Sequence, residues 1–116
     1  MPREGGLTED VASESCVEKL AQFFPRARPV RIQVKVLAPG LGARRFVETS
    51  VVEFATSKEA LFASTLPLEF DDHVRVEEID GALIAEASVV AVQYHQSRKA
   101  VAVRFLTAPR HWILEP

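Results

Sequence analysis

The sequence predicts a mainly β fold: a six-stranded antiparallel barrel with an N-terminal α-helix. Apolar and polar residues alternate with a period of two over much of residues 30–105, as in half-buried strands. A helical period of 3.6 is confined to residues 9–24. Turn-forming residues separate the strand-like runs at regular spacing, which is typical of small barrels and sandwiches. We favour a barrel because closure removes exposed strand edges.

The length of 116 residues suits a single domain. Hydrophobic residues make up 47% of the chain and charged residues 26%, which is the balance of a globular protein and not of a disordered one. We expect residues 1–25 to form a leader and an amphipathic helix, and residues 26–116 to form the barrel domain. An eight-stranded α/β barrel is excluded because that fold needs about 250 residues.

The helix predicted over residues 9–24 has one apolar face. The members of this face recur at helical spacing: Cys16, Val17, Leu20, Ala21, Phe23 and Phe24. Thr8 or Ser13 is expected to cap the start of the helix, and Pro25 is expected to end it. A short helix is marginal unless it packs against something. The face is therefore expected to cover the chain's own barrel or a second copy, and the latter would make a homo-oligomer.

Six strands are predicted, over residues 30–37, 45–54, 60–66, 74–79, 82–93 and 100–106. Asp80-Gly81 indicates a tight hairpin between the fourth and fifth strands. The fifth strand is long enough that we expect a bend or a bulge in it. Trp112 is expected to plug one end of the core together with Phe105, which alternates with apolar residues of the last strand.

The sequence also indicates the cellular compartment of the protein. No apolar run approaches the roughly 20 residues of a membrane-spanning helix, and the first residues lack the apolar segment of a signal peptide. The single cysteine, Cys16, excludes an internal disulfide. These features predict a cytoplasmic protein without a membrane span.

Enzymatic motifs are lacking in the sequence. His73, His95 and His111 do not stand at metal-ligand spacing from one another or from Cys16. The sequence contains neither a nucleophile-elbow motif nor a glycine-rich phosphate loop. Cys16 lies on the apolar face of the predicted helix, where a small buried hydrophobe is the simplest interpretation. We therefore expect no enzyme, no metal and no cofactor.

Charge is unevenly distributed along the chain although the net charge is only −2. Residues 19–47 carry seven basic and no acidic residues, and residues 48–86 carry ten acidic and two basic ones. Opposite charges on neighbouring strands are one explanation. The other is an anionic ligand, because Arg26, Arg28 and Arg31 form a basic stretch that leads into the first predicted strand. Arginine binds phosphate and the edge of guanine with a bidentate fork.

The order of these segments resembles the PilZ domain family over roughly residues 26–114. The resemblance rests on the arginine-rich linker, on four strand segments and on the tryptophan that follows: residues 31–36, 46–55, 70–76 and 101–105, then Trp112. PilZ domains are six-stranded barrels of bacteria, and many are receptors for cyclic di-GMP. The resemblance implies a bacterial signalling or adaptor protein with cyclic di-GMP as its possible ligand.

The first ligand motif of the family, R-x-x-x-R on the linker, is altered in this chain. Arg28 and Arg31 are one residue too close together, and Arg26 and Arg31 are one residue too far apart. Arg31 and Lys35 have the right spacing, but lysine replaces the second arginine and lies inside the predicted strand.

The second ligand motif, D/N-x-S-x-x-G after the second strand, is altered as well. Glu53 keeps an acceptor, Ala55 has lost the hydroxyl donor, and Lys58 replaces the glycine that permits close approach. If the resemblance holds, the ligand site comprises Arg26, Arg28, Arg31, Glu53, Ala55 and Lys58. Lost hydrogen bonds to a buried ligand predict weak binding or none.

Three functions remain open from the sequence. The first is a PilZ-type adaptor that binds cyclic di-GMP weakly or not at all and acts through an unidentified protein partner. The second is a working cyclic di-GMP receptor that uses Arg26, Arg28 and Arg31 in a shifted geometry. The third is an unrelated small barrel that binds nucleic acid through the basic block, although this block has no interleaved aromatic residues.

Overall fold

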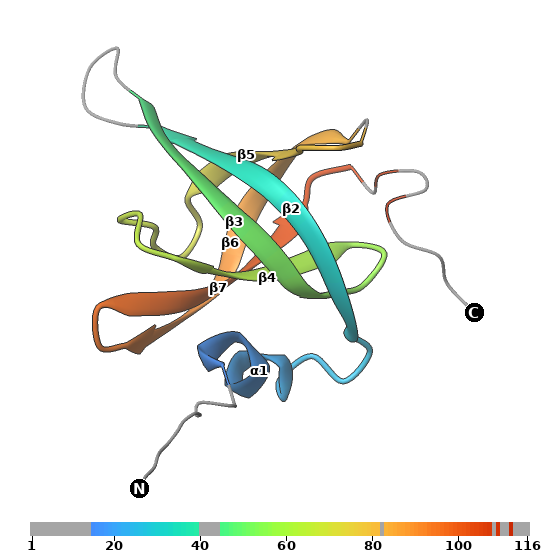
Figure 1. Cartoon of the computed structure of the whole chain (residues 1–116). Helices are drawn as coiled ribbons and strands as arrows, with labels where there is room; N and C mark the ends of the chain where they lie inside the picture. The colour runs from blue at the N-terminus through green and yellow to red at the C-terminus, as the bar shows by residue number, and fades with distance from the viewer. Residues whose placement is uncertain (1–14, 40–44, 82, 108, 110–111, 113–116) are drawn as a thin grey trace, which may run out of the picture.

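The computed structural model describes residues 15–39, 45–81, 83–107, 109 and 112. It confirms the predicted fold class: six antiparallel strands form a closed barrel, and a short helix lies against its outside (Figure 1). The elements are α1 (Cys16–Ala21), β2 (Arg28–Pro39), β3 (Arg45–Ala55), β4 (Glu59–Ser64), β5 (His73–Glu78), β6 (Ile84–His95) and β7 (Arg98–Phe105). Around the barrel the strand order is β2-β3-β4-β7-β6-β5, which closes on β2.

The barrel core consists of the inward-facing residues of all six strands, as the period of two predicts. Its larger buried members are Val34, Val36, Val52, Phe62, Val74, Val76, Val89, Val101 and Val103. Trp112 is 6% exposed and meets Phe105 edge to face, with ring centroids 5.2 Å apart. The expectation that these two aromatic residues anchor the core is confirmed.

A second apolar cluster lies between α1 and the outer face of the barrel. Val17 and Leu20 of the helix are buried against Leu61 of β4 and against Ala100 and Ala102 of β7. The predicted packing of the helix on its own barrel is thereby confirmed. Because alanine is small, β7 lets the helix approach the sheet closely.

The ends of the helix differ from the prediction. Thr8, Ser13 and the rest of residues 1–14 lie outside the described residues, and the N-cap of α1 is Ser15, whose Oγ accepts a hydrogen bond from the Glu18 N–H (3.1 Å). The helix ends at Ala21 and not at residue 24. The next turn is tightened by i→i−3 bonds, including one from the Phe23 N–H to the Leu20 oxygen (3.0 Å).

The prediction that Phe23 belongs to the apolar face of the helix is wrong, because its side chain is 70% exposed. The tightened turn after Ala21 changes the angle between successive side chains from that of an α-helix. Phe23 therefore leaves the buried stripe, whereas Phe24 stays packed against the second apolar cluster.

The strand bounds also place one candidate arginine differently from the prediction. β2 begins at Arg28 and not at residue 30, so Arg28 is a strand residue, as Arg31 is in the predicted strand. The strand starts early because Arg28 pairs with Ala55 at the end of β3. The pairing shifts between Pro29 and Ile32, where a bulge is inserted.

The hairpin between β5 and β6 is wider than Asp80-Gly81 predicts. β5 ends at Glu78, β6 begins at Ile84, and the Glu78 N–H donates to the Leu83 oxygen (2.9 Å) across the intervening loop. The bulge expected in the long fifth strand is confirmed, because the pairing of β6 with β7 shifts between Val89 and Ala91.

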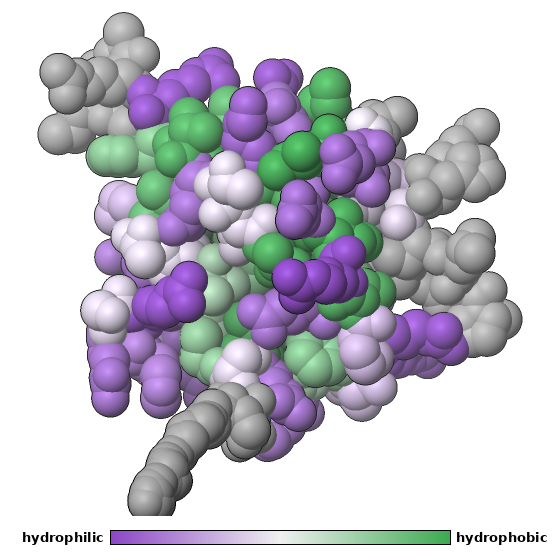
Figure 2. All heavy atoms as spheres, in the orientation of Figure 1, coloured by the Kyte–Doolittle hydropathy of each residue, from purple (hydrophilic) through white to green (hydrophobic). Residues whose placement is uncertain are grey.

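The β2–β3 side of the molecule is not uniformly polar. Figure 2 shows hydrophobic side chains over β2 and β3 that are interrupted by hydrophilic ones. Phe46 and Val47 at the start of β3 are among the exposed large hydrophobic residues. None of the helices in the described part of the chain has the length and apolar character that crossing a membrane requires.

Candidate functional site

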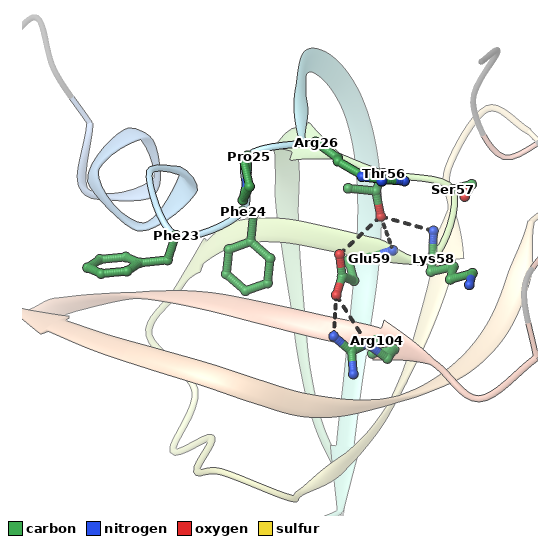
Figure 3. A pocket seen from close by; sticks show the side chains of 9 residues that line it. All are labelled: Phe23, Phe24, Pro25, Arg26, Thr56, Ser57, Lys58, Glu59 and Arg104. Carbon is green, nitrogen blue, oxygen red and sulfur yellow. Dashed lines mark hydrogen bonds and ion pairs between the residues drawn. The ribbon is translucent and has the colours of Figure 1, made fainter. Parts of the chain in front are cut away.

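A pocket of about 570 Å³ lies where the turn after α1 meets the β3–β4 loop (Figure 3). It is lined by Phe23, Phe24, Pro25, Arg26, Thr56, Ser57, Lys58, Glu59 and Arg104. The volume falls within the range of small-molecule sites, roughly 300–1,000 Å³. We call it the α1 pocket.

The polar wall of the α1 pocket is a loop fixed by Thr56. Its Oγ1 accepts hydrogen bonds from the N–H groups of Lys58 (3.0 Å) and Glu59 (2.9 Å). The backbone N–H of Thr56 donates to the backbone carbonyl oxygen of Glu59 (3.0 Å). Non-glycine residues with positive φ in the described part of the chain are Asp71 and Gln96, so Lys58 occupies an ordinary backbone conformation. The loop therefore holds its shape without a glycine at position 58.

The β7 side of the pocket carries an ion pair. Arg104 donates from Nε (3.1 Å) and Nη2 (2.5 Å) to Oε2 of Glu59. The two residues lie opposite each other in the register of β4 with β7. The same carboxylate accepts from Thr56 Oγ1 at 3.1 Å. Arg104 is therefore already partnered by an acid, while Arg26 and Lys58 bring two further positive charges to the wall.

The apolar wall comes from the turn after α1. Phe24 and Pro25 line this side, and the side chain of Arg26 extends toward the loop that carries Thr56 (Figure 3). Phe23 lies at the outer end and points away from the other labelled residues. The α1 pocket thus combines an aromatic wall with a mainly basic one, a chemistry that suits a planar or aromatic group bearing negative charge.

Arg26 and Lys58 are the two candidate site residues that the fold brings together in the α1 pocket. Arg31 and Glu53 line a different cavity, of about 430 Å³, on the outer face of β2 and β3. There Oε1 of Glu53 accepts a hydrogen bond from the Ser15 Oγ at 2.8 Å, which ties the start of α1 to β3.

The remaining two candidates, Ala55 and Arg28, line neither of these two cavities. Ala55 is fully buried and belongs to the barrel core, and Arg28 is exposed opposite it at the start of β2. A shift in the β3–β4 pairing between Val52 and Phe54 explains the position of Ala55, because the side chain of Phe54 packs on the outer cluster while that of Ala55 turns inward.

Sequence reasoning missed Arg104 and Glu59. Arg104 is the one charged residue in the run from Val101 to Phe105, and this position signals an outward-facing side chain. The pairing of β4 with β7 is what places it beside Glu59, and a sequence does not reveal the order of strands around a barrel.

The other chemistry-bearing residues are dispersed. His73 and His95 are exposed, and His111 lies outside the described residues. Cys16 is half-buried against the cluster beneath α1. Within residues 15–39, 45–81 and 83–107, no group of three or more His, Cys, Asp or Glu side chains is arranged to hold a metal ion.

No protein-family model matches the chain, and no curated protein resembles it closely enough to count as a match.

Proposed function

We propose that the chain is a non-enzymatic bacterial adaptor of the PilZ type that acts through contacts with other proteins in the cytoplasm. It binds cyclic di-GMP weakly or not at all. The observation that carries this proposal is the split of the candidate site: the α1 pocket keeps Arg26 and Lys58, whereas Ala55 faces the barrel core and Arg31 lines another cavity. The resemblance of the segment order to PilZ domains supports the same assignment.

The energetic argument concerns the number of polar contacts that a nucleotide would find. Cyclic di-GMP has two phosphates and two guanines, so a tight receptor needs several convergent donors. Each missing hydrogen bond costs on the order of 1 kcal/mol, and more when a charge is involved. The carboxylate of Glu59 also neutralises Arg104, so this arginine is less available to a phosphate. We expect a dissociation constant no tighter than roughly 10 μM, or about −7 kcal/mol.

Calorimetric titration of the full chain with cyclic di-GMP tests this proposal. Any residual binding should weaken as salt is raised, since it rests on solvent-accessible charges. Lys58→Ala should reduce such binding. Lys35→Ala is the control and should leave binding unchanged, because Lys35 is an exposed residue of β2 outside the α1 pocket. Submicromolar binding that survives physiological salt would overturn the adaptor proposal.

A cyclic di-GMP receptor is the second candidate, and one observation favours it. Arg26 and Lys58, which are far apart in sequence, line the same pocket beside the ring of Phe24. Arginine and an aromatic ring can both stack on a guanine base. In that case Arg26→Ala should abolish tight binding, while Arg31→Ala, in the other cavity, should change it little.

A further inference from the structure

We propose that this chain associates with itself, by docking the turn that carries Phe70 into the α1 pocket of a second copy. Phe70 lies between β4 and β5, and its side chain is 72% exposed. Aromatic residues, phenylalanine among them, are enriched at protein interfaces. The inference goes beyond the proposed function, because it assigns a partner of defined chemistry.

The Phe70 turn is held by hydrogen bonds on both sides. The Asp71 N–H donates to the Val89 oxygen (2.8 Å), and the Val89 N–H donates to the Asp72 oxygen (2.8 Å). The Glu69 N–H donates to Oδ2 of Asp72 (2.9 Å), and the Asp72 N–H donates back to the Glu69 oxygen (3.0 Å). An aromatic side chain on a fixed backbone loses little conformational entropy when it binds.

Asp71 has a φ of 75°, a left-handed conformation that costs free energy in a residue other than glycine. The hydrogen bonds of the turn maintain this conformation, and it keeps the neighbouring Phe70 displayed to solvent. The ring of Phe70 adds nothing to the core of a single copy, because it lies outside the barrel.

The charges around Phe70 define the chemistry of its partner. Glu69, Asp71 and Asp72 flank the ring, so a matching site needs an apolar wall with a basic rim. The α1 pocket has Phe24 and Pro25 on one side, and on the other Arg26 and Lys58 beside the Arg104–Glu59 ion pair, which leaves the rim net basic. A second copy of this chain is the occupant whose complementary surface the structure itself displays.

The turn and the α1 pocket share no residue, so each copy offers both surfaces. Two copies can exchange turns about a two-fold axis, or successive copies can join head to tail. A contact made by one aromatic ring and a few exposed charges is small, so we expect weak, salt-sensitive association that requires high protein concentration.

Sedimentation velocity over a concentration series up to about 1 mM, the weak end of specific affinities, tests this inference. Wild-type chain should show an average sedimentation coefficient that rises with concentration. Phe70→Ala, which removes the ring, and Lys58→Glu, which reverses the charge of the pocket rim, should each weaken association at least tenfold. Phe46→Ala is the matched control, because that exposed ring lies on β3 outside both surfaces.

Mixing the two variants gives the sharpest result. The Phe70→Ala copy keeps an intact pocket and the Lys58→Glu copy keeps an intact turn, so an equimolar mixture should form a complex that stops at one copy of each. Equal melting temperatures for Phe70→Ala and Phe46→Ala would establish that the first variant is folded.

The inference is overturned if wild-type chain stays monomeric at every concentration, if Phe70→Ala associates as well as wild type, or if the mixture fails to form a complex. Its failure is distinguishable from that of the proposed function. Phe70→Ala leaves the α1 pocket of its own copy untouched, so cyclic di-GMP titration of this variant should match that of wild type.

Discussion

Glu48 shows how a single carboxylate can fasten two strands. Its oxygens accept hydrogen bonds from the Ser64 Oγ (2.6 Å), the Thr65 Oγ1 (2.6 Å) and the Thr65 N–H (3.0 Å), which ties β3 to the end of β4. Burial alone would raise the pKa of the Glu48 carboxyl. The hydrogen bonds from Ser64 and Thr65, together with the charge of Arg98, outweigh burial and lower this pKa below its usual 4.5.

A depressed pKa makes the stabilisation by Glu48 dependent on pH. The folded chain holds the proton less tightly than the unfolded chain, so the stabilisation is present above about pH 4.5 and is lost as pH falls through the lower, folded pKa. Glu48→Gln should therefore lower the free energy of unfolding at pH 7 by about 1 kcal/mol, since solvent screens this partly exposed group.

Urea unfolding at a series of pH values checks this expectation. The difference between wild type and Glu48→Gln should shrink as the pH drops below 4.5. Glu86→Gln is the control, because Glu86 forms an exposed ion pair with Arg75 and should contribute little. A difference that stays constant down to pH 2 would show that the charge of Glu48 has no part in it.

Trp112 gives the second prediction at this scale. Its indole is nearly fully buried against Phe105, so Trp112→Ala should lose about 3–5 kcal/mol of stability. Calorimetric melting should show this loss, and Tyr94→Ala, at an exposed aromatic residue of β6, should show a much smaller one. An unchanged melting temperature would contradict the core role of the tryptophan.

At the scale of elements, the sequence predicts what depends on local periodicity. The stripe containing Val17 and Leu20 and the six alternating runs identified α1 and the strands. The end of the helix was not predictable, because the hydrophobic period does not show where an α-helix tightens into a turn. This turn is what leaves Phe23 exposed. The direction of Ala55 was not predictable either, since a bulge inverts the alternation that the prediction relies on.

The packing of α1 gives a prediction about that element. A helix of six residues does not persist in water alone, so its apolar contacts hold it in place. Removing residues 1–24 should expose the outer face of the barrel around Leu61 and Ala102 and cause aggregation. Sedimentation checks this expectation, with removal of residues 1–14 as the control that keeps α1. A chain of residues 25–116 with the stability and sedimentation of the full chain would contradict it.

At the scale of the whole molecule, the acidic block of residues 48–86 meets basic residues from other parts of the sequence across strands. Lys35 of the basic block lies opposite Glu77 in the β2–β5 register, and Arg104 of β7 pairs with Glu59. Neutralisation between strands therefore accounts for part of the charge pattern. The resemblance placed Arg26 and Lys58 in one candidate site, and both line the α1 pocket. The contribution of Arg104 to that pocket was not predictable, because only the order of strands around the barrel brings β7 beside β4.

Ligand linkage turns the α1 pocket into a prediction about the stability of the whole chain. A ligand that binds only the folded state stabilises it by RT ln(1 + [L]/Kd). With cyclic di-GMP at about 100 μM and a dissociation constant no tighter than roughly 10 μM, the gain is at most about 1.4 kcal/mol. For a domain of this size the melting temperature should rise by no more than roughly 6 °C.

The dependence of this shift on salt and on Lys58 identifies its origin. A shift that arises in the α1 pocket should shrink as salt screens the basic wall, and it should be smaller still in Lys58→Ala. Ala55→Ser should not enlarge it, because the new hydroxyl would point into the barrel core. A buried hydroxyl without a partner costs about 1–3 kcal/mol, so that variant should melt earlier than wild type with or without nucleotide. A larger shift in Ala55→Ser would mean that residue 55 reaches the ligand, and it would refute the division of the site between the pocket and the core.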